Sequence, residues 1–357
     1  MKVAHIVSHL DTGGAEKLVA EISNLMVPHG IEIKVITLFN GRGVPFKILD
    51  KDNIELIELN YNSKYNPKIA RELYRLTKDC DIVHTHTYYA QLYASIFIPK
   101  TKLVTTEHST NNNRRGKIIM RIFDYLMYRR YMKIICISEA TKNSLNKWLK
   151  STKNKSIIIH NGINLSKYLE APPIPRVELG VDKNKIILAC VGRLEKAKNQ
   201  ESLIRAFKGV KIDATLLLIG HGQKEKELKE LVEELKLQDK VIFLGQRNDV
   251  ERILKSSDIF ILPSLWEGFG LSAVEAVAAG LPLLLSNVPG LKDVIDALHV
   301  KVDYFDPIDI GDITLKINEM CNEIINRRQT YSIGKDKLES YSVDNMVNKY
   351  LESYKVN

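Results

Sequence analysis

Short apolar runs alternate with longer stretches of helical apolar spacing along most of the chain. After Gly13 and Gly14, for example, apolar residues from Ala15 to Met26 recur with the spacing of one helix face. The apolar runs predict buried strands at Val3–Ser8, Glu32–Phe39, Ile54–Leu59, Asp81–His84, Leu103–Thr106, Lys133–Ile137 and Ser156–Ile159. Buried strands that alternate with helices favour an α/β fold with a parallel, doubly wound sheet.

The same alternation begins again after a proline-rich segment, Ala171–Pro175, which can continue neither a helix nor a strand ladder. Further strands are predicted at Lys185–Val191, Thr215–Gly220, Val241–Gly245, Asp258–Pro263 and Pro282–Ser286. A chain of 357 residues is long enough for two such domains. We therefore predict a first domain over residues 1–168, a linker over 169–176, a second domain over 177–338 and a C-terminal segment over 339–357. Because parallel sheets bind ligands at the carboxyl ends of their strands, two facing domains would form a cleft.

Composition narrows the class of protein only in part. Apolar residues make up 45% and charged residues 27% of the chain, as in ordinary globular proteins. The four cysteines lie in or beside apolar runs without C-x-x-C spacing, which indicates buried thiols and a reducing compartment. The first residues are typical of a strand rather than an export signal, so we expect a cytoplasmic protein. The net charge of +9 favours polyanionic partners, namely nucleic acid, anionic lipid or a phosphorylated substrate.

Two loops behind predicted strands carry glycines or cations. Gly13 and Gly14 let the backbone approach a ligand at a helix N-terminus, although a tight turn without ligand remains an alternative. Gly192 ends a buried strand, and Arg193 and Lys198 follow it. A guanidinium and an ammonium at this spacing can hold a diphosphate and neutralise it as it leaves, whereas the alternative is a solvated basic loop.

The third loop, Pro263–Gly270, leads into a helix that we expect to run from near Gly270 to Gly280. Glu275 then lies on the first or second turn of the helix, and Glu267 lies in the loop before it. Glycines on both sides of Phe269 allow backbone amides to face a phosphate. The carboxylates would suit a ribose diol and a sugar, although solvated surface glutamates are the alternative.

These motifs occur together in one order along the chain. The E-x7-E spacing of Glu267 and Glu275, the Gly-Arg…Lys motif at 192–198 and the Thr-Gly-Gly-Ala-Glu run at 12–16 resemble the retaining family-four glycosyltransferases of the group 1 type. The resemblance continues through Asn161–Asn164 to Tyr341-Ser342. It implies the GT-B fold, in which two Rossmann-like domains face each other across a cleft and the last helix crosses back to the N-terminal domain. Asn164 stands where the family often has Asp, so we expect only a turn role for it.

The resemblance implies a role for each matched residue. Arg193 and Lys198 would bind the donor diphosphate and stabilise it as the leaving group, and Glu275 would hold the ribose. Glu267 and the amides of 268–271 would contact the transferred sugar, Gly14 would let the first loop close on the donor, and His108 would face the donor sugar. The implied catalytic residues are Arg193, Lys198, Glu267 and His108. The implied donor-binding residues are Gly13, Gly14, Gly192, Arg193, Lys198, Glu267, Gly268, Phe269, Gly270, Leu271 and Glu275.

No metal and no separate cofactor are expected, because Arg193 and Lys198 can neutralise the phosphates. The D-x-D spacings at 50–52 and 79–81 fall among turn residues or at the start of a strand. His84 and His86 share one face of a strand end, which is a zinc-like pair. Since no third ligand is near in sequence, we expect a structural or acceptor-pocket role.

The segment 114–130 combines many cations with apolar residues at helical spacing. Two interpretations stay open. It could be an interfacial helix that rests on anionic lipid at the inner face of the cell membrane, or an ordinary amphipathic helix that covers the sheet with a solvated basic face.

The motifs favour transfer of a sugar from a nucleotide-diphosphate sugar to a glycan or polyprenyl-linked acceptor. The family most often uses UDP-sugars, with GDP-mannose as an alternative, and surface polysaccharides such as capsule or lipopolysaccharide are the expected products. A nucleotide-sugar epimerase or hydrolase of the same architecture is an alternative, although the E-x7-E and Gly-Arg…Lys motifs argue against it. A nucleic-acid-binding protein is disfavoured because no helix-turn-helix, zinc-finger or RNP motif is present, and a dehydrogenase because the dinucleotide fingerprint is missing.

Overall fold

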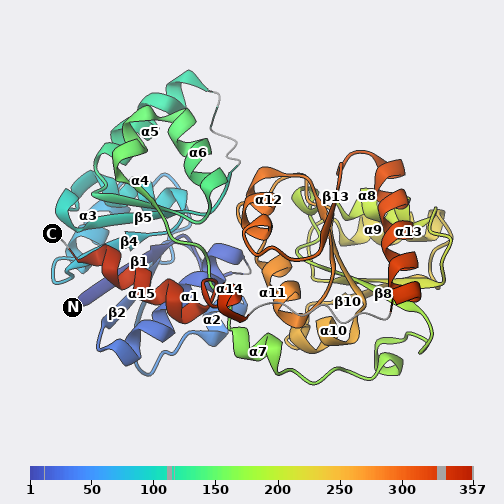
Figure 1. The fold of residues 1–357 in the computed structure, drawn as a ribbon. Helices are drawn as coiled ribbons and strands as arrows, with labels where there is room; N and C mark the ends of the chain where they lie inside the picture. The colour runs from blue at the N-terminus through green and yellow to red at the C-terminus, as the bar shows by residue number, and fades with distance from the viewer. Residues whose placement is uncertain (12, 111–114, 116, 328–334, 356–357) are drawn as a thin grey trace. The chain divides into compact units, whose positions relative to one another are not determined.

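The computed structural model describes residues 1–11, 13–110, 115, 117–327 and 335–355, and its contacts divide the chain into two units. Unit 1 comprises Met1–Asn161 and Val343–Asn357, and unit 2 comprises Gly162–Ser342. Each unit is a parallel sheet with helices on both faces, which confirms the predicted fold class (Figure 1). Thr12, Arg114 and Gly116, which belong to motifs named above, lie outside the described residues.

The sheet of unit 1 has the strand order β3-β2-β1-β4-β5-β6-β7. Its strands are β1 (Lys2–Val7), β2 (Glu32–Thr37), β3 (Glu55–Glu58), β4 (Ile82–Thr85), β5 (Leu103–Glu107), β6 (Lys133–Cys136) and β7 (Ser156–Ile158). One face packs against α1 (Gly14–Met26) and α15 (Val343–Tyr354), and α2 (Val44–Ile48) contacts α1. The other face packs against α3 (Lys68–Leu76), α4 (Tyr88–Phe97), α5 (Ile118–Arg129) and α6 (Glu139–Trp148). Because both faces are covered, the strands can be apolar on both sides.

The sheet of unit 2 has the corresponding order β10-β9-β8-β11-β12-β13. Its strands are β8 (Ile186–Val191), β9 (Ala214–Ile219), β10 (Val241–Gly245), β11 (Ile259–Leu262), β12 (Leu283–Ser286) and β13 (Val302–Phe305). Its helices are α7 (Leu165–Leu169), α8 (Gln200–Phe207), α9 (Glu225–Glu234), α10 (Val250–Ser256), α11 (Leu271–Ala279), α12 (Pro289–Asp296), α13 (Ile310–Arg327) and α14 (Lys335–Glu339). The sequence did not predict β13, because this edge strand has a mixed pattern in which Phe305 alone is fully buried.

Each sheet reverses its strand order beside its first strand. β1 lies between β2 and β4, and β8 lies between β9 and β11. In an open parallel sheet, the loops behind two strands that wind away in opposite directions leave a crevice between them, where such folds bind ligands. The loops after β8 and β11 carry the predicted donor motifs of unit 2, and the loops after β1 and β4 carry Gly13 and His86 in unit 1.

The chain passes between the units at 161/162 and 342/343 rather than at the predicted boundaries. The expected linker 169–176 belongs to unit 2, because Ile174 is buried and exchanges two hydrogen bonds with Ser256. The Ile174 amide donates to Ser256 Oγ at 2.7 Å, and this hydroxyl donates to the Ile174 carbonyl at 2.8 Å. The prolines stiffen this segment, but its anchoring residue assigns it to the second unit.

Helix α15 belongs to unit 1 although it ends the described chain. Its Tyr350 and Tyr354 are fully buried in unit 1. The Tyr354 hydroxyl lies 2.6 Å from Nδ1 of His84, and the Tyr350 hydroxyl lies 3.3 Å from Oγ1 of Thr106. The C-terminal helix therefore completes the polar interior of the first sheet as well as its apolar core.

Candidate functional site

In unit 2 the loops after β8 and β11 are joined to each other. The Leu265 amide donates a hydrogen bond to the Ala197 carbonyl at 2.8 Å. Asn199 adopts the left-handed conformation at φ 53°, and its side-chain amide donates to the Pro307 carbonyl at 2.7 Å. Gln200 donates to the carbonyl of Arg193 at 3.0 Å. These bonds fix the path of both loops, so the side chains that they carry are held in place before any ligand binds.

Lys198 and Glu267 form an ion pair across these two loops. Ser264 Oγ donates to the same Glu267 oxygen at 2.9 Å. The pair is largely buried, with side chains 19% and 10% exposed, whereas the Arg193 side chain is 53% exposed and lies 3.1 Å from Glu195. The sequence motifs predicted both partners of the pair, but not the pairing and not Ser264. The signal for Ser264 was its place at the carboxyl end of β11, three positions before Glu267.

Gly192 gives Lys198 its position, because a Cβ built on this glycine would lie 3.4 Å from the Lys198 side chain. A larger residue would press the ammonium away from the end of β8. Gly220 supports the same strand end from β9, since a Cβ there would come within 2.1 Å of the Gly192 carbonyl oxygen. Gly220 borders the candidate site and belongs to none of the motifs recognised in the sequence, although a glycine that directly follows a buried strand is a recognisable signal.

The Gly268–Gly270 turn leads directly into α11, and Glu275 lies on the second turn of this helix, nearly buried. Gly270 has φ +80°, a conformation that favours glycine. Phe269 is buried, with its ring centroid 5.9 Å from that of Tyr341, so it anchors the turn rather than facing a ligand with its side chain. The N-terminal end of α11 presents the positive end of the helix dipole beside the Lys198–Glu267 pair.

Gly270→Ala should destabilise unit 2, because the left-handed backbone costs about 1–2 kcal/mol for a residue with a Cβ. The new Cβ would also lie 2.4 Å from Leu291 Cδ1. Gly245→Ala is the matched control, since Gly245 has φ +64° with no atom within 4 Å of its Cβ position. Urea unfolding should show a free-energy loss about 1–3 kcal/mol larger for Gly270→Ala than for the control. Equal losses would mean that the turn is not packed as described.

In unit 1 the loops after β1 and β4 are also joined. The Ser8 amide donates to Thr87 Oγ1 at 2.9 Å, and the two hydroxyls lie 2.7 Å apart. A Cβ on Gly13 would come within 2.1 Å of Glu16 Oε2, whereas a Cβ on Gly14 would meet nothing within 4 Å. The Glu16 carboxylate is the movable end of a long side chain, so packing among the described residues requires glycine at neither position. The donor-side role expected for Gly13 and Gly14 stays a prediction.

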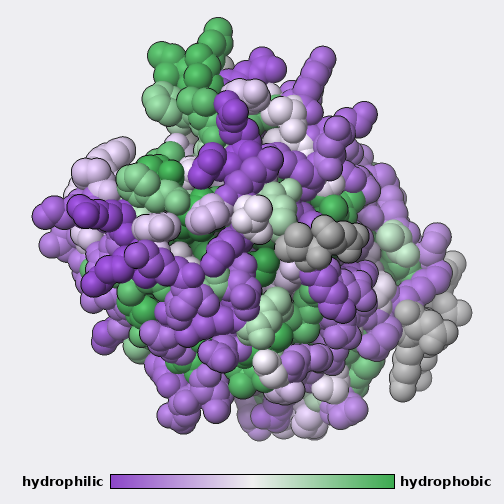
Figure 2. All heavy atoms as spheres, turned by 90° about the vertical axis from the view of Figure 1, so that its left-hand side faces the viewer, coloured by the Kyte–Doolittle hydropathy of each residue, from purple (hydrophilic) through white to green (hydrophobic). Residues whose placement is uncertain are grey.

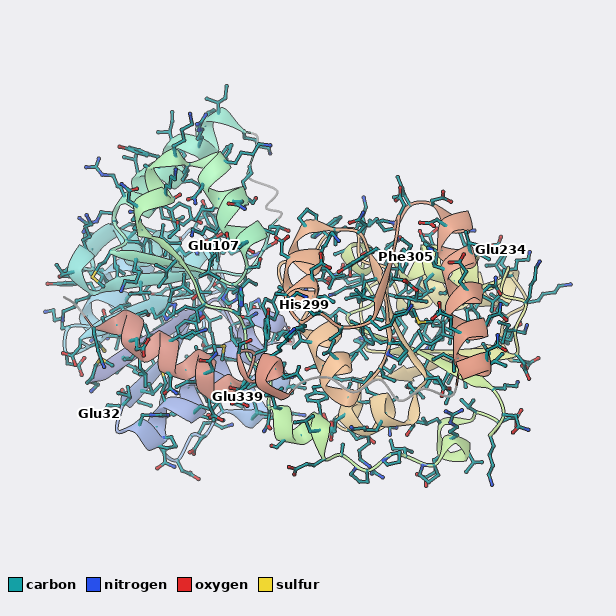
Figure 3. All side chains as sticks on the ribbon, viewed as in Figure 1. Glu32, Glu107, Glu234, His299, Phe305 and Glu339 are labelled. Atoms are coloured by element: carbon teal, nitrogen blue, oxygen red, sulfur yellow. The ribbon has the colours of Figure 1, made fainter. Side chains whose placement is uncertain are left out.

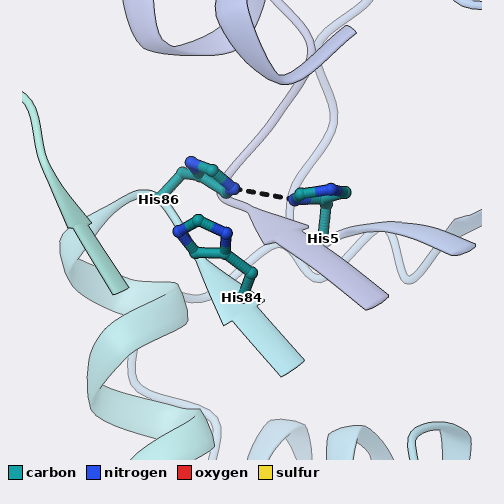
Figure 4. Close-up of side chains that lie close together, drawn as sticks. All are labelled: His5, His84 and His86. Atoms are coloured by element: carbon teal, nitrogen blue, oxygen red, sulfur yellow. Dashed lines mark hydrogen bonds between the residues drawn. The ribbon is translucent and has the colours of Figure 1, made fainter. Parts of the chain in front are cut away.

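Buried histidines lie together at the carboxyl ends of β1 and β4 (Figure 4). His5 on β1 is in register with His84 on β4, and His86 follows on the same side of the strand. His5 Nδ1 lies 2.9 Å from His86 Nε2, and the rings of His84 and His86 stack at 4.1 Å. His108, after β5, continues the group with its ring centroid 5.7 Å from that of His86. The predicted donor-facing histidine is thus the half-buried end of a buried row of imidazoles.

The sequence pattern identified His84 and His86 but not His5, which the structure places beside them as a third histidine. Ligand atoms of these residues lie within 4.8 Å of one another, so the set has the composition of a metal site. His84, however, uses both ring nitrogens, one toward Tyr354 and the other toward Thr106 Oγ1 at 2.7 Å. A metal ion would have to displace one of these partners, so the described geometry is that of a hydrogen-bonded core.

Burial keeps this row of imidazoles neutral. It lowers the pKa of His5 to about 3 and that of His108 to about 4. Burial, with the neighbouring imidazoles as a lesser cause, lowers the pKa values of His84 and His86 well below the ordinary value. The unfolded chain, with histidine pKa values near 6.5, therefore binds more protons than the folded chain at mildly acid pH.

Unit 1 should accordingly lose stability as pH falls below about 6.5, by up to about 1.4 kcal/mol per pH unit for each of these histidines. Its unfolding can be followed by Trp148 fluorescence in a Trp266→Phe background at pH 7.5 and 5.5. His86→Asn should reduce the pH dependence, whereas His29→Gln, which alters an exposed histidine, should leave it unchanged. A free energy of unfolding that does not change between the two pH values would contradict a neutral histidine core.

Glu107, at the end of β5, is buried on the face of the sheet that α4 and α5 cover (Figure 3). It accepts hydrogen bonds from Gln91 at 2.7 Å and from Tyr128, and pairs with Arg115 at 3.2 Å. The sequence analysis assigned Arg115 to a basic segment, but its charge is committed to Glu107. Buried carboxylates need such partners, so Arg115 is part of the interior of unit 1.

The remaining sequence candidates have structural roles in the described residues. The Asp79 carboxylate lies 2.7 Å from Lys2, which is the main reason that its pKa falls to about 2. Asp50 accepts hydrogen bonds from the Asn53 side chain and from two backbone amides of its turn. Asn164 caps α7 by accepting from the Lys167 amide at 3.2 Å. The cysteines are buried and free.

Two Rossmann-type sheets, each with its candidate loops at the switch point, and a last helix that returns to the first unit define a GT-B glycosyltransferase fold. Comparison with known proteins agrees. The family model described as Glycosyltransferase Family 4 matches residues 12–167, and that described as Glycosyl transferases group 1 matches residues 174–337. The chain belongs to this glycosyltransferase family.

Several relatives extend over most of the chain. An uncharacterized glycosyltransferase of Methanocaldococcus jannaschii is 30% identical over 72% of this chain and 70% of its own. The UDP-Gal:alpha-D-GlcNAc-diphosphoundecaprenol alpha-1,3-galactosyltransferase of Escherichia coli is 28% identical over 78% of this chain and 79% of its own. Among solved structures, Anabaena Alr3699/HepE in complex with UDP and glucose has a TM-score of 0.84 at 20% identity, covering 99% of each chain.

Among the helices of the described residues, none combines the length and the apolar character needed to cross a membrane.

Proposed function

We propose that this glycosyltransferase moves a sugar, with retention of its anomeric configuration, from a nucleotide-diphosphate sugar to a lipid-linked glycan. The observation that carries the proposal is the Lys198–Glu267 pair, held by Ser264 between the loops after β8 and β11. The pair lies at the switch point of the sheet and beside the N-terminus of α11. A preorganised cation beside a helix N-terminus suits a diphosphate.

The two cations would divide the work on the diphosphate. Lys198 is largely buried and fixed, so its ammonium would hold one phosphate at a defined position. Arg193 is half-exposed beside Glu195, so its guanidinium is free to turn toward the second phosphate. As the bond to the sugar breaks, negative charge grows on the leaving diphosphate. Both cations would then stabilise the transition state more than the bound substrate.

The two carboxylates would hold the ends of the donor. Glu275 lies on the second turn of α11, where a carboxylate can accept hydrogen bonds from both hydroxyls of a ribose. Glu267 is steered by Lys198 and Ser264, so its carboxylate would present a fixed acceptor to the sugar. The amides of 268–271 would complete the contact from the α11 end of the turn. His108, kept neutral by burial, would offer the sugar a hydrogen-bonding group without a charge.

The reaction would proceed by front-face attack, in which the acceptor hydroxyl approaches on the side from which the diphosphate leaves. The departing phosphate oxygen would take the proton of the acceptor hydroxyl as the new bond forms. We name no protein nucleophile, and catalysis would depend on positioning and on stabilised phosphate charge. Arg193 and Lys198 supply the positive charge that stabilises the leaving phosphate, so the proposal includes no metal ion.

A UDP-sugar is the proposed donor, and a polyprenyl-diphosphate-linked glycan in surface polysaccharide synthesis is the proposed acceptor. The printed name of the E. coli relative, which specifies UDP-Gal and a diphosphoundecaprenol-linked acceptor, supports both choices. Membership of the family does not determine the sugar or the nucleotide of the donor, so the test below includes a GDP-linked donor.

The test measures transfer of radiolabel from UDP-glucose, UDP-galactose, UDP-N-acetylglucosamine or GDP-mannose to undecaprenyl-diphosphate N-acetylglucosamine in the presence of EDTA. We expect one donor to label the lipid fraction, with the anomeric configuration retained in the product. Arg193→Ala should slow transfer by about 10²–10³-fold. Arg205→Ala, which removes a cation on α8 that pairs with Glu201, should transfer at the wild-type rate.

Release of label as free sugar at the same rate with and without acceptor would identify a hydrolase instead. Loss of activity in EDTA that is restored by a divalent ion would contradict the metal-independent mechanism. Equal rates for Arg193→Ala and wild type would overturn the assignment of the diphosphate site.

A further inference from the structure

The outward face of α5 is apolar, which is unusual for a helix on the surface of a soluble domain. Ile118, Ile119, Ile122 and Phe123 have 80%, 69%, 59% and 54% of their surface exposed. The residues of α5 that are buried are Asp124, Met127 and Tyr128. The helix therefore does not present a solvated basic face with its apolar residues on the sheet, which was one of the two interpretations open from the sequence.

The C-terminal end of α4 extends this apolar surface. Ile96 and Phe97, at the end of α4, are 49% and 53% exposed. A cavity of about 930 Å³ lies between them and α5, lined among others by Ile96, Phe123 and Leu126. Hydrophobic residues gather at the top of the molecule in Figure 2, at the height where Figure 1 places α5. We refer to the outward face of α5 together with the end of α4 as the α4–α5 surface.

The charges around the α4–α5 surface are all of one sign. Cations that line the cavity include Lys100, Arg129 and Lys155, and a smaller cavity of about 340 Å³ beside it adds Arg121 and Lys150. No carboxylate belongs to the described residues that line either cavity. The acid that α5 carries, Asp124, points inward and accepts a hydrogen bond from Trp148 Nε1 at 2.9 Å.

Within the described part of the chain, no carboxylate forms an ion pair with these cations. Lys155 is partly buried and donates to backbone carbonyls of Tyr128 and Tyr131, and its pKa falls to about 8, first through burial and then through Lys100 and Arg129. The side chains of Lys100 and Arg129 make no hydrogen bond or ion pair with any other residue that the structure describes. Uncompensated cations around an apolar surface favour an anionic partner with an apolar interior.

We propose that the α4–α5 surface binds an anionic phospholipid bilayer, with the isoleucine and phenylalanine side chains among the acyl chains and the cations against lipid phosphates. Long apolar side chains flanked by Lys and Arg are the arrangement that holds a helix in the plane of a membrane interface. A second copy of this chain fits less well, because a symmetric contact would place this set of cations against itself. The proposal concerns membrane docking and does not depend on which sugar is transferred.

The test is co-sedimentation of the full chain with vesicles of phosphatidylcholine alone and of phosphatidylcholine with phosphatidylglycerol, without donor or acceptor. We expect binding to the anionic vesicles that weakens with added salt, because counter-ions screen the cations. Ile122→Glu should weaken this binding at least about tenfold. The matched control is Leu315→Glu, which replaces a residue of unit 2 that is 54% exposed and should bind like the wild type.

Failure of the wild type to sediment with anionic vesicles would overturn the proposal, as would equal losses for Ile122→Glu and Leu315→Glu. A dimer in sedimentation velocity that Ile122→Glu dissociates would assign the surface to a second copy instead. Nucleotide-sugar turnover is measured separately from vesicle binding. A negative result here therefore leaves the proposed transfer standing, and inactivity with normal vesicle binding would overturn only the proposed transfer.

Discussion

The candidate site depends on the order of the parallel strands within each sheet, whose two faces are both covered by helices. The connection after the first strand of each sheet turns to one side, and the chain later returns to the other side, so the first strand ends beside the fourth. In unit 2 this brings the loops after β8 and β11 together although they are far apart in sequence. Lys198 can then meet Glu267, and backbone hydrogen bonds hold both loops in place.

The same constraint has a different chemical result in unit 1. There the switch point holds neutral imidazoles in place of an ion pair, and α15 supplies a hydroxyl to one of them. Buried polar groups must be hydrogen-bonded, so the C-terminal helix and the row of histidines depend on each other. The chain thereby couples the placement of its last helix to the interior of its first sheet.

The fold could be predicted from the sequence because its signals are local. Strand runs such as Leu103–Thr106 and the glycines around α11 identify elements without reference to distant residues. β13 was missed because an edge strand covered unevenly has no clean apolar pattern. The linker was misplaced because prolines signal stiffness, while the membership of Ile174 depends on Ser256, which is distant in sequence.

The candidate site was predictable in its residues but not in its contacts. The spacing of Glu267 and Glu275 and the Gly-Arg…Lys run identified side chains on the two loops. The pairing of Lys198 with Glu267 and the contribution of Ser264 depend on strand order, which no single motif encodes. His5 was missed for the same reason, since its relation to His84 is a sheet register. The apolar exposure of α5 likewise required knowing which side of the helix meets the sheet.

The loops after β8 and β11, with the start of α11, are the proposed binding site of the donor diphosphate. Hydrogen–deuterium exchange of the full chain with and without saturating UDP, in EDTA, tests this most directly. We expect UDP to slow amide exchange within residues 192–199 and 264–275. Glu275→Ala should abolish this protection, whereas Glu230→Ala, a change at an exposed position on α9, should preserve it. Protection elsewhere in the chain with none in these two segments would contradict the account.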